Sequence, residues 1–414
     1  MAVLALYFVA TKLRRKAQTM HAQRIIQKFL DEECPSIHVK RRAGLALVTD
    51  AAQRGGLTLL RLSRQVRSTT ALRHRIKQCD RLLSNGHLES ERPEIYRALA
   101  RRLLHEHRRV AIIVDWSDLL KDVSQHVLRA TVILEGRSFV IYEEIHDSDS
   151  YNVAAVHGKF METLRTILPE RCEPIIITDA GFRGTWFRML NELKFAWIGR
   201  VRNREKTLLR GSEEWVDCQQ LYPRARKHAQ DLGIVDHVKS APVKCRMVLT
   251  KKDGKGRQNK TAFGEKKQSA HSKKQAKGQR EPWLLAVSTK LAFLDADEIV
   301  KWYEFRMQIE QTFRDLKNPQ WGMGLRNSQT RKPRRLKALL LIAALLSFAF
   351  WLIGLAALAR GFRIQYGSLA KTSQTASILT LARRWIDEHQ KRMTLPELAH
   401  ALTQLRNMIK TYDI

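Results

Sequence analysis

Acidic residues are scarce in this sequence of 414 residues. Asp and Glu number 41 against 74 Lys and Arg, which leaves a formal net charge of +33. A surplus of this size opposes folding by self-repulsion unless a dense polyanion binds the chain. Nucleic acid is therefore the expected partner, because its phosphates supply the missing negative charge.

Cysteine is also rare. The five cysteines are far apart and form no C-x-x-C pair, which argues against a disulfide framework and against a zinc site. This usage fits a reducing compartment, so we expect a cytoplasmic protein. The cysteines are Cys34, Cys79, Cys172, Cys218 and Cys245.

What is present is a globular composition, with 44% hydrophobic and 28% charged residues. This excludes wholesale disorder, collagen-like chains and coiled-coil rods. The length predicts two or three domains with enough core to fold without disulfides or structural metals. No internal repeat is apparent.

Two apolar segments bear on a membrane location. Residues 1–10 are apolar, but the basic run follows them, whereas a signal peptide carries its charge first. Because Met20 opens a more ordinary sequence, we interpret residues 1–19 as an atypical extension. Residues 338–359 lack charge over 22 positions and are long enough to span a bilayer. They are rich in Ala between basic flanks, so we interpret them as a buried core helix and expect no membrane; a single span is the alternative.

Residues 20–106 are basic and helical in pattern. Short helices are expected at 24–30, 45–53, 58–66 and 69–83, and the last two resemble a helix-turn-helix element that reads DNA. The alternative is a solvated basic face. The cations of the last helix that we expect to contact DNA are Arg73, Arg75, Lys77 and Arg81.

The pattern changes near residue 107. Three strand-like runs, the last two joined by a tight turn at Glu135–Arg137, precede an alternation of helix, strand, helix and strand. This order is typical of an α/β protein with a ribonuclease-H-like core. The expected strands are 110–114, 127–134, 138–145, 174–178 and 195–200, and the expected helices are 153–167 and 185–193.

A mostly β insertion follows at 201–282 and ends in a long basic loop, residues 251–280, rich in Lys, Gly, Gln and Ser. A strand at 283–288 and a helix at 297–316 then resume the core. Near the C-terminus we expect a helix at 378–389 and a final one opened by the capping box Thr394–Glu397. The predicted division is 1–19 extension, 20–106 helical DNA-binding domain, 107–200 and 283–360 core, 201–282 insertion, and 361–414 helical region for dimerisation.

Two aspartates follow buried strands of the predicted core. Asp115 is expected to end the first strand and Asp179 the strand at 174–178. Each alone is equally a turn or helix-cap residue. Parallel neighbouring strands would bring the two together, and like charges at close range require a cation. Oxygen-only ligands suit Mg²⁺ or Mn²⁺.

The predicted helix 297–316 offers a third carboxylate. Tyr303, Arg306, Glu310 and Lys317 are spaced 3, 4 and 7 residues apart. At roughly 100° per residue, they fall within an arc of about 60° on one face. A surface face with an Arg306–Glu310 ion pair is the alternative.

This pattern, Tyr303-x2-Arg306-x3-Glu310-x6-Lys317, matches without gaps the YREK motif of bacterial DDE transposases of the insertion-sequence-four family. The stretches Val114–Asp118 and Thr178–Phe182 are also similar to that family. The resemblance covers the chain from about Met20 to its end. Residues 1–19 have no recognised counterpart.

The resemblance implies a metal triad of Asp115, Asp179 and Glu310 that holds Mg²⁺, or Mn²⁺ in its place. It also implies cut-and-paste transposition through a DNA hairpin. The substrate would be double-stranded DNA, both the terminal inverted repeats and the target. A homodimer would bind it, and the protein would be cytoplasmic and associated with the nucleoid. Tyr303, Arg306 and Lys317 would contact phosphates. Trp283 would stack where a base has flipped out, with a buried strand tryptophan as the alternative.

Two other functions fit the same residues. One is a ribonuclease-H-like nuclease or resolvase without strand transfer. The other is a basic regulatory DNA-binding protein without catalytic activity.

Overall fold

The computed structural model describes residues 22–120, 122–202, 205–252, 281–320, 322–362, 377–388 and 393–412. The predicted extension at 1–19 lies outside these residues. So does the predicted basic loop at 251–280, apart from Lys251 and Lys252.

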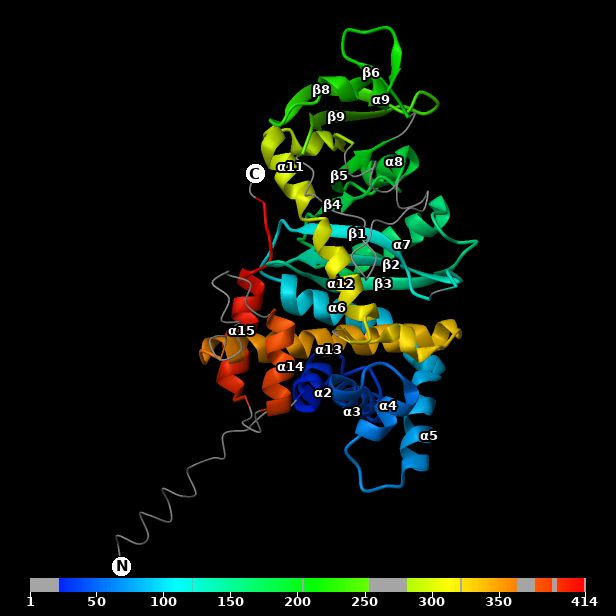
Figure 1. Ribbon diagram of the computed structural model, residues 1–414, viewed down its shortest axis with the longest axis vertical. Coiled ribbons are helices and arrows are strands. Elements are labelled where there is room, and N and C mark those ends of the chain that lie inside the picture. The colour runs from blue at the N-terminus through cyan, green and yellow to red at the C-terminus, as the bar shows by residue number, and fades with distance from the viewer. Residues whose placement is uncertain are drawn as a thin grey trace, which may run out of the picture.

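The described residues form a mixed α/β protein around one ten-stranded sheet (Figure 1). The strand order is β3-β2-β1-β4-β5-β10-β9-β8-β6-β7. The pairs β1–β4 and β4–β5 are parallel, and the other pairs are antiparallel. The strands are β1 (Ala111–Asp118), β2 (Gln125–Ile133), β3 (Ser138–Asp147), β4 (Ile175–Thr178), β5 (Ala196–Val201), β6 (Lys206–Leu209), β7 (Trp215–Asp217), β8 (Gln230–His237), β9 (Val243–Thr250) and β10 (Trp283–Val287).

The first half of the sheet follows the sequence prediction. All four residues of β4 are buried, as are the first four of β1, because helices cover both faces. The β2–β3 hairpin turns at Gly136, whose φ of +68° is readily adopted only by glycine. Leu134 N–H donates to the carbonyl of Arg137 and closes the turn.

The predicted insertion extends this sheet. β10 forms hydrogen bonds with β5 on one side and with β9 on the other. The strands β6–β9 therefore continue the sheet that carries β1 and β4, as one hydrogen-bonded ladder.

The N-terminal region is helical, as predicted. The side chain of Thr58 caps the helix at Leu59–Gln65, and that of Asn85 caps a long helix at Gly86–Leu104 that the sequence pattern does not separate from its neighbours. The five helices are α2 (Ala22–Glu33), α3 (Val39–Gly55), α4 (Leu59–Gln65), α5 (Leu72–Leu83) and α6 (Gly86–Leu104).

The apolar helix α13 (Pro333–Ala359) crosses the molecule between helices α2–α5 and the sheet, whereas α6 packs on the sheet itself (Figure 1). Among the described residues it is the one helix long and apolar enough to cross a membrane. Of the 18 residues in its most apolar stretch, 94% are buried inside the protein. The helix packs against α3, β3, α14 (Ile378–Glu388) and α15 (Leu395–Asn407). This burial agrees with the interpretation as a core helix. The predicted capping box at Thr394 and Glu397 opens α15.

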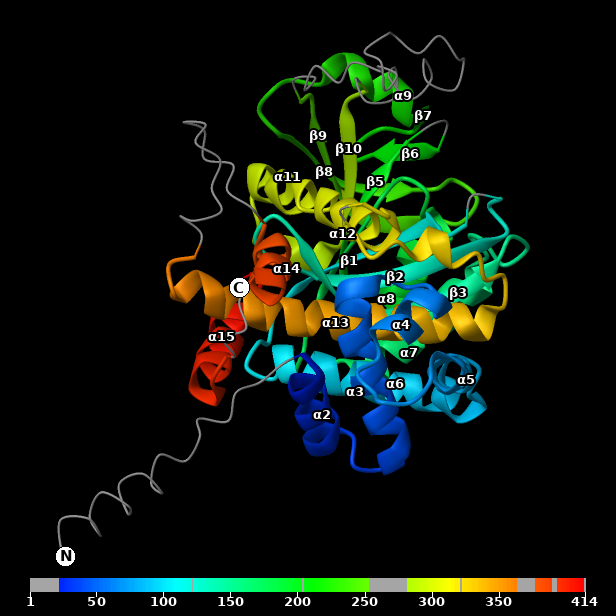
Figure 2. The same ribbon diagram turned by 60° about the horizontal axis from the view of Figure 1, so that its bottom comes forward.

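The prediction of one helix at 297–316 is wrong. The structure has α11 (Ala296–Glu304) and α12 (Met307–Lys317), which Figure 2 shows as separate segments beside the sheet. At the junction, amides bond three residues back, as in Arg306 N–H to the Tyr303 carbonyl. Phe305 and Arg306 keep right-handed helical dihedrals, so α12 retains the 3.6-residue periodicity on which the prediction depended. The remaining α-helices near the sheet are α7 (Ala154–Ile167), α8 (Gly184–Glu192) and α9 (Cys218–Leu221).

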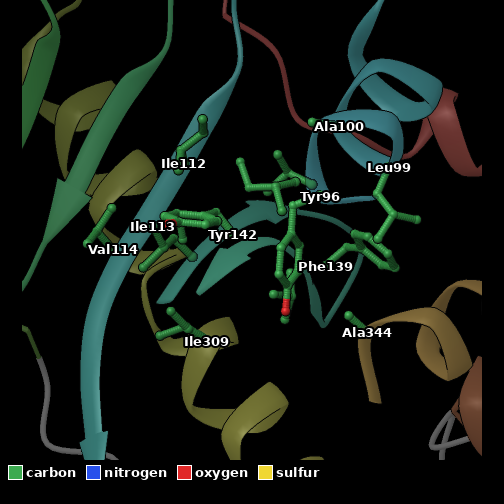
Figure 3. Packing of buried hydrophobic residues seen from close by; sticks show 14 of the residues in the cluster. Tyr96, Leu99, Ala100, Ile112, Ile113, Val114, Phe139, Tyr142, Ile309 and Ala344 are labelled. Atoms are coloured by element: carbon green, nitrogen blue, oxygen red, sulfur yellow. The ribbon is translucent and has the colours of Figure 1, made fainter. Parts of the chain in front are cut away.

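One hydrophobic core joins these layers (Figure 3). Tyr96 and Leu99 of α6 reach Phe139 of β3, while Ile309 of α12 and Ala344 of α13 enter from the other elements. The helix that carries Glu310 is thus packed into the same core as the strand that carries Asp115.

Candidate active site

Asp115 lies inside β1. The prediction that it ends the strand is wrong, because the ladder with β2 continues through the pair Asp118–His126. Burial does change at this position, since Val114 is fully buried and the next three residues are half-buried. One carboxylate oxygen of Asp115 accepts from the Trp116 amide at 2.8 Å, and the other lies 3.2 Å from Nη1 of Arg306.

Asp179 follows β4 directly, as predicted. Its Oδ1 accepts from the Gly181 amide at 2.8 Å, which ties the carboxylate to its own turn. Because Ile113 of β1 pairs with Ile177 of β4, both aspartates stand two residues beyond a paired position of parallel strands. The two carboxylates therefore reach the same edge of the sheet.

Glu310 enters the site from α12 through Arg306. The Arg306 Nη2 donates to Glu310 Oε1 at 3.0 Å while Nη1 reaches Asp115. The guanidinium thus joins two carboxylates that are 195 positions apart in the sequence. The Arg306 and Asp115 side chains are 14% and 13% exposed, whereas Glu310 is 42% exposed and opens to solvent.

The electrostatics of this cluster are dominated by excess acid. Burial, and next the neighbouring Asp179, raise the pKa of Asp115 to about 7, although Arg306 opposes the shift. Burial disfavours the charge on Arg306, yet its pKa lies above the usual range because Tyr303 and the three acids surround it. One guanidinium therefore compensates the carboxylates only in part.

Lys317 stands at the other end of α12. Its Nζ donates to Ser117 Oγ at 2.5 Å, two residues beyond Asp115, and lies 5.3 Å from the centre of the Phe313 ring. Burial, and next Arg326, lower the pKa of Lys317 to about 8. The ammonium is therefore held against the same strand as Asp115.

The two predicted aromatic site residues contact each other. Trp283 begins β10, is half-buried, and meets Tyr303 edge-on with ring centres 5.0 Å apart. Tyr303 is buried, and this burial raises the pKa of its hydroxyl. In this arrangement the buried Tyr303 ring holds the Trp283 ring in place.

The carboxylates expected to bind a metal are present, but they do not form a preformed coordination site. Within the described ranges, no group of three or more His, Cys, Asp or Glu residues lies close enough to hold an ion. Arg306 bonds to both Asp115 and Glu310. The possible ligands are nevertheless all carboxylate oxygens, and their negative charge exceeds the single positive charge of Arg306. Such a site suits Mg²⁺ or Mn²⁺.

The predicted N-terminal contacts separate into two groups. Lys77 and Arg81 of α5 line a hollow of about 610 Å³ that Lys40 and Arg41 complete from α3. Arg75 instead donates to the carbonyls of Arg64 and Val66, so it caps the end of α4. Arg73 Nε contacts His74 at 3.2 Å and does not line the hollow.

Sequence reasoning missed a ring cluster beside Asp115. Trp116 Nε1 donates to His157 of α7 at 2.9 Å, and the rings of His146 and Tyr151 lie against Trp116. The signal that could have found it is the position of Trp116 directly after Asp115. Its partners come from β3, α7 and the segment between them, and no spacing rule links them to residue 116.

It also missed a buried ion pair below the site. Arg129 of β2 and Glu143 of β3 are 2% and 1% exposed and paired through Arg129 Nε and Nη2. The Arg129 guanidinium stacks on Phe313 of α12, 4.8 Å from the ring centre, and Tyr96 of α6 donates to Glu143. The pair therefore connects the sheet to both helices.

Comparison with known protein families gives a match over most of the chain's middle part. A family model described as the transposase DDE domain matches residues 106–348, more than half of the chain. Among curated proteins, none matches.

Proposed function

Because the chain belongs to the family of transposases with a DDE domain, we propose that it is a metal-dependent enzyme that excises and inserts a DNA element by cut-and-paste through a hairpin at each end. The finer placement, in the insertion-sequence-four group and near the transposase of the tetracycline-resistance transposon, is supported by the gapless YREK spacing from Tyr303 to Lys317. A ribonuclease-H-like core is supported by the antiparallel β3-β2-β1 strands followed by parallel β4 and β5.

The observation that carries the proposal is the Arg306 guanidinium between Asp115 and Glu310. It joins carboxylates of β1 and α12 at the sheet edge that Asp179 also reaches. Asp115, Asp179 and Glu310 would hold Mg²⁺, or Mn²⁺ in its place. Divalent ions held there would supply activation of a water or a 3′-hydroxyl for in-line attack and stabilisation of the leaving oxygen.

The protein groups around the triad bind and orient the DNA. Arg306 offers a planar fork suited to two oxygens of one phosphate, and Lys317 adds a point charge above Ser117. Trp283, supported by Tyr303, offers a ring for a flipped base.

The basic surface supplies affinity for the phosphate backbone. The hollow lined by Lys40, Lys77 and Arg81 is suited to phosphates of the terminal repeats. A homodimer that holds two DNA ends, and a location with the nucleoid in the cytoplasm, complete the proposal. The net charge of +33 supports both the DNA partner and this location.

The test uses the purified full chain with the DNA that flanks its gene, in Mg²⁺. Asp115→Ala, Asp179→Ala and Glu310→Ala should each abolish nicking, hairpin formation and strand transfer while leaving end binding intact. The exposed Glu213→Ala, between β6 and β7, is the matched control and should cut like wild type.

Each outcome separates the candidate functions. A triad variant that still cuts removes that residue from the site, and full activity in EDTA contradicts the metal requirement. Products that are cut but never joined to target DNA would indicate a nuclease or resolvase. Binding without any cutting would indicate a regulatory DNA-binding protein.

A further inference from the structure

The segment Ser148–Val153, between β3 and α7, contacts both the strand that carries Asp115 and the turn that carries Asp179. Asn152 Nδ2 donates to the carbonyl of Gly181, two residues beyond Asp179, at 3.3 Å. Tyr151 packs against Trp116, the residue after Asp115, with ring centres 5.2 Å apart. The segment is thus fixed at the mouth of the proposed active site.

The Tyr151 ring is held by two neighbouring rings and is still partly exposed to solvent. His126 lies against it at 4.6 Å between ring centres, and Trp116 meets it at an interplanar angle of 61°. The residue is nevertheless 46% exposed, among the most exposed large hydrophobic residues in the part of the chain that the structure describes. A ring that is rigidly held yet uncovered loses little conformational freedom when another flat group stacks on it.

The chemistry of the surroundings selects the occupant. The Tyr151 ring lies beside the acidic centre, because it packs against Trp116, the residue after Asp115, and against His126, whose Nδ1 is 3.0 Å from Asp118 Oδ1. The exposed apolar residues here are Tyr151, Val153 and Val123, whose carbonyl accepts from Ser148, and three residues are too few for a stable protein interface. An unpaired base of a bound strand has the flat face that such a ring stacks on, whereas paired bases hide their faces within the duplex.

We propose that Tyr151 is a stacking platform for an unpaired nucleobase next to the phosphate that is cut at the site of Asp115, Asp179 and Glu310. This inference rests on the proposed function. β1 and β4 lie between β3, which leads to Tyr151, and β10, which carries Trp283. Tyr151 therefore takes a nucleotide on the opposite side of the scissile phosphate from Trp283.

The experiment places 2-aminopurine, unpaired, at each of the first few positions on either side of the cut in the flanking DNA. Fluorescence quenching on binding is measured with the full chain in EDTA, so that no cutting occurs. One position should be quenched by wild type, Tyr151→Phe and Tyr151→Trp, and not by Tyr151→Leu or Tyr151→Gln. Val153→Ala, an exposed neighbour without a ring, is the matched control and should quench like wild type.

A second measurement tests the same contact by coupling. Removing the stacked base to leave an abasic site should weaken binding to wild type by roughly 5- to 150-fold, the range that corresponds to stacking of one base. The same abasic site should cost Tyr151→Leu almost nothing, because the partner ring is already absent.

Quenching by Tyr151→Leu equal to wild type overturns the inference, as does equal loss for Tyr151→Phe and Tyr151→Leu. The proposed function fails on a different readout. If wild type does not cut in Mg²⁺, the active site is refuted, while the quenching assay without metal still reports on Tyr151.

Discussion

Arg306 is the residue on which the electrostatics of the site depend. Its guanidinium lies against Asp115 and Glu310, and Asp179 is close enough to raise the pKa of Asp115. Removing one partner of a buried ion pair leaves an uncompensated charge in a medium of low dielectric constant. The fold therefore depends on Arg306 as much as the chemistry does.

We expect Arg306→Met to lower the free energy of unfolding by about 3 kcal/mol at pH 8. Adding Asp115→Asn should recover part of that loss, because it removes the charge left unpaired. Urea unfolding measures both changes. Arg331→Met is the control, since Arg331 is 79% exposed and its ion pair with Asp122 should contribute almost nothing. Equal losses for the two methionine variants would contradict the role given to Arg306.

His157 makes a pH-dependent contribution to stability. Burial lowers the pKa of His157 from 6.5 to about 4, and its ring accepts from Trp116 Nε1. Between these values the unfolded chain binds a proton that the folded chain does not. Stability from this group is therefore complete above pH 6.5 and is lost as the pH falls toward 4, by about 3 kcal/mol in all.

The comparison is between wild type and His157→Gln, whose amide oxygen can still accept from Trp116. Chemical unfolding from pH 4 to pH 8 should show the extra acid sensitivity in wild type alone. Parallel pH curves for the two proteins would exclude His157 as its source.

At the residue scale, the sequence predicts the members of the site better than their contacts. The spacing of Tyr303, Arg306, Glu310 and Lys317 places them on one face, and the structure brings Arg306 to Asp115. The sequence does not reveal that Tyr303 is buried against Trp283, or that Arg75 caps α4. Those outcomes depend on tertiary neighbours that no local pattern encodes.

At the scale of elements, helix α13 approaches α14 closely at one glycine. A Cβ added at Gly354 would lie 2.4 Å from the Ile378 carbonyl oxygen, a backbone atom that cannot move aside alone. Gly158 of α7 differs, because the nearest atom to an added Cβ there is Met189 Sδ at 3.8 Å.

Gly354→Ala should therefore lower the free energy of unfolding by about 1–3 kcal/mol through overpacking. Gly158→Ala should raise it by about 0.5–1 kcal/mol, because alanine favours the helix and restricts the unfolded chain. Thermal and urea unfolding of the two variants measure this difference in sign. A stabilising Gly354→Ala would show that α13 and α14 are not in this contact.

The division between α11 and α12 shows where element prediction stops. Between Ala296 and Lys317 the sequence has neither Gly nor Pro, so nothing in it marks an interruption. The break comes from hydrogen bonding, as the ladder tightens to three-residue spacing around Phe305 and Arg306. The long apolar helix, by contrast, is readable from composition, although only packing shows that protein surrounds it.

For the whole molecule, the net charge of +33 predicts DNA binding that weakens steeply with salt. Lys40, Lys77 and Arg81 line one hollow, and each phosphate contact contributes roughly 0.9 to the slope of log K against log salt. Changing all three to Gln should reduce the slope by about 3, as measured by fluorescence anisotropy from 50 to 300 mM salt. Lys159→Gln, exposed on α7, is the control; a slope unchanged in the triple variant would remove the hollow from the DNA path.

The α/β class and the strand order of the first half were predictable because the buried strands and the β2–β3 turn have local signatures. The continuity of the sheet was not, since β10 pairs with β5 across the whole insertion and with β9 inside it. A short turn fixes the pairing of a hairpin such as β2–β3, but no such turn links β10 to either of its neighbours.

The position of β10 has a consequence for any attempt to trim the protein. With neighbours on both sides, this strand has no free flank. Excising residues 202–282 would remove one neighbour of this apolar strand and leave its amides and carbonyls unpaired. The exposed edge would pair with the same edge of other molecules, and the shortened protein would aggregate. Strands β6–β9 thus protect the β10 edge of the sheet that carries the aspartates. A minimal version of the enzyme would need another element to cover this edge.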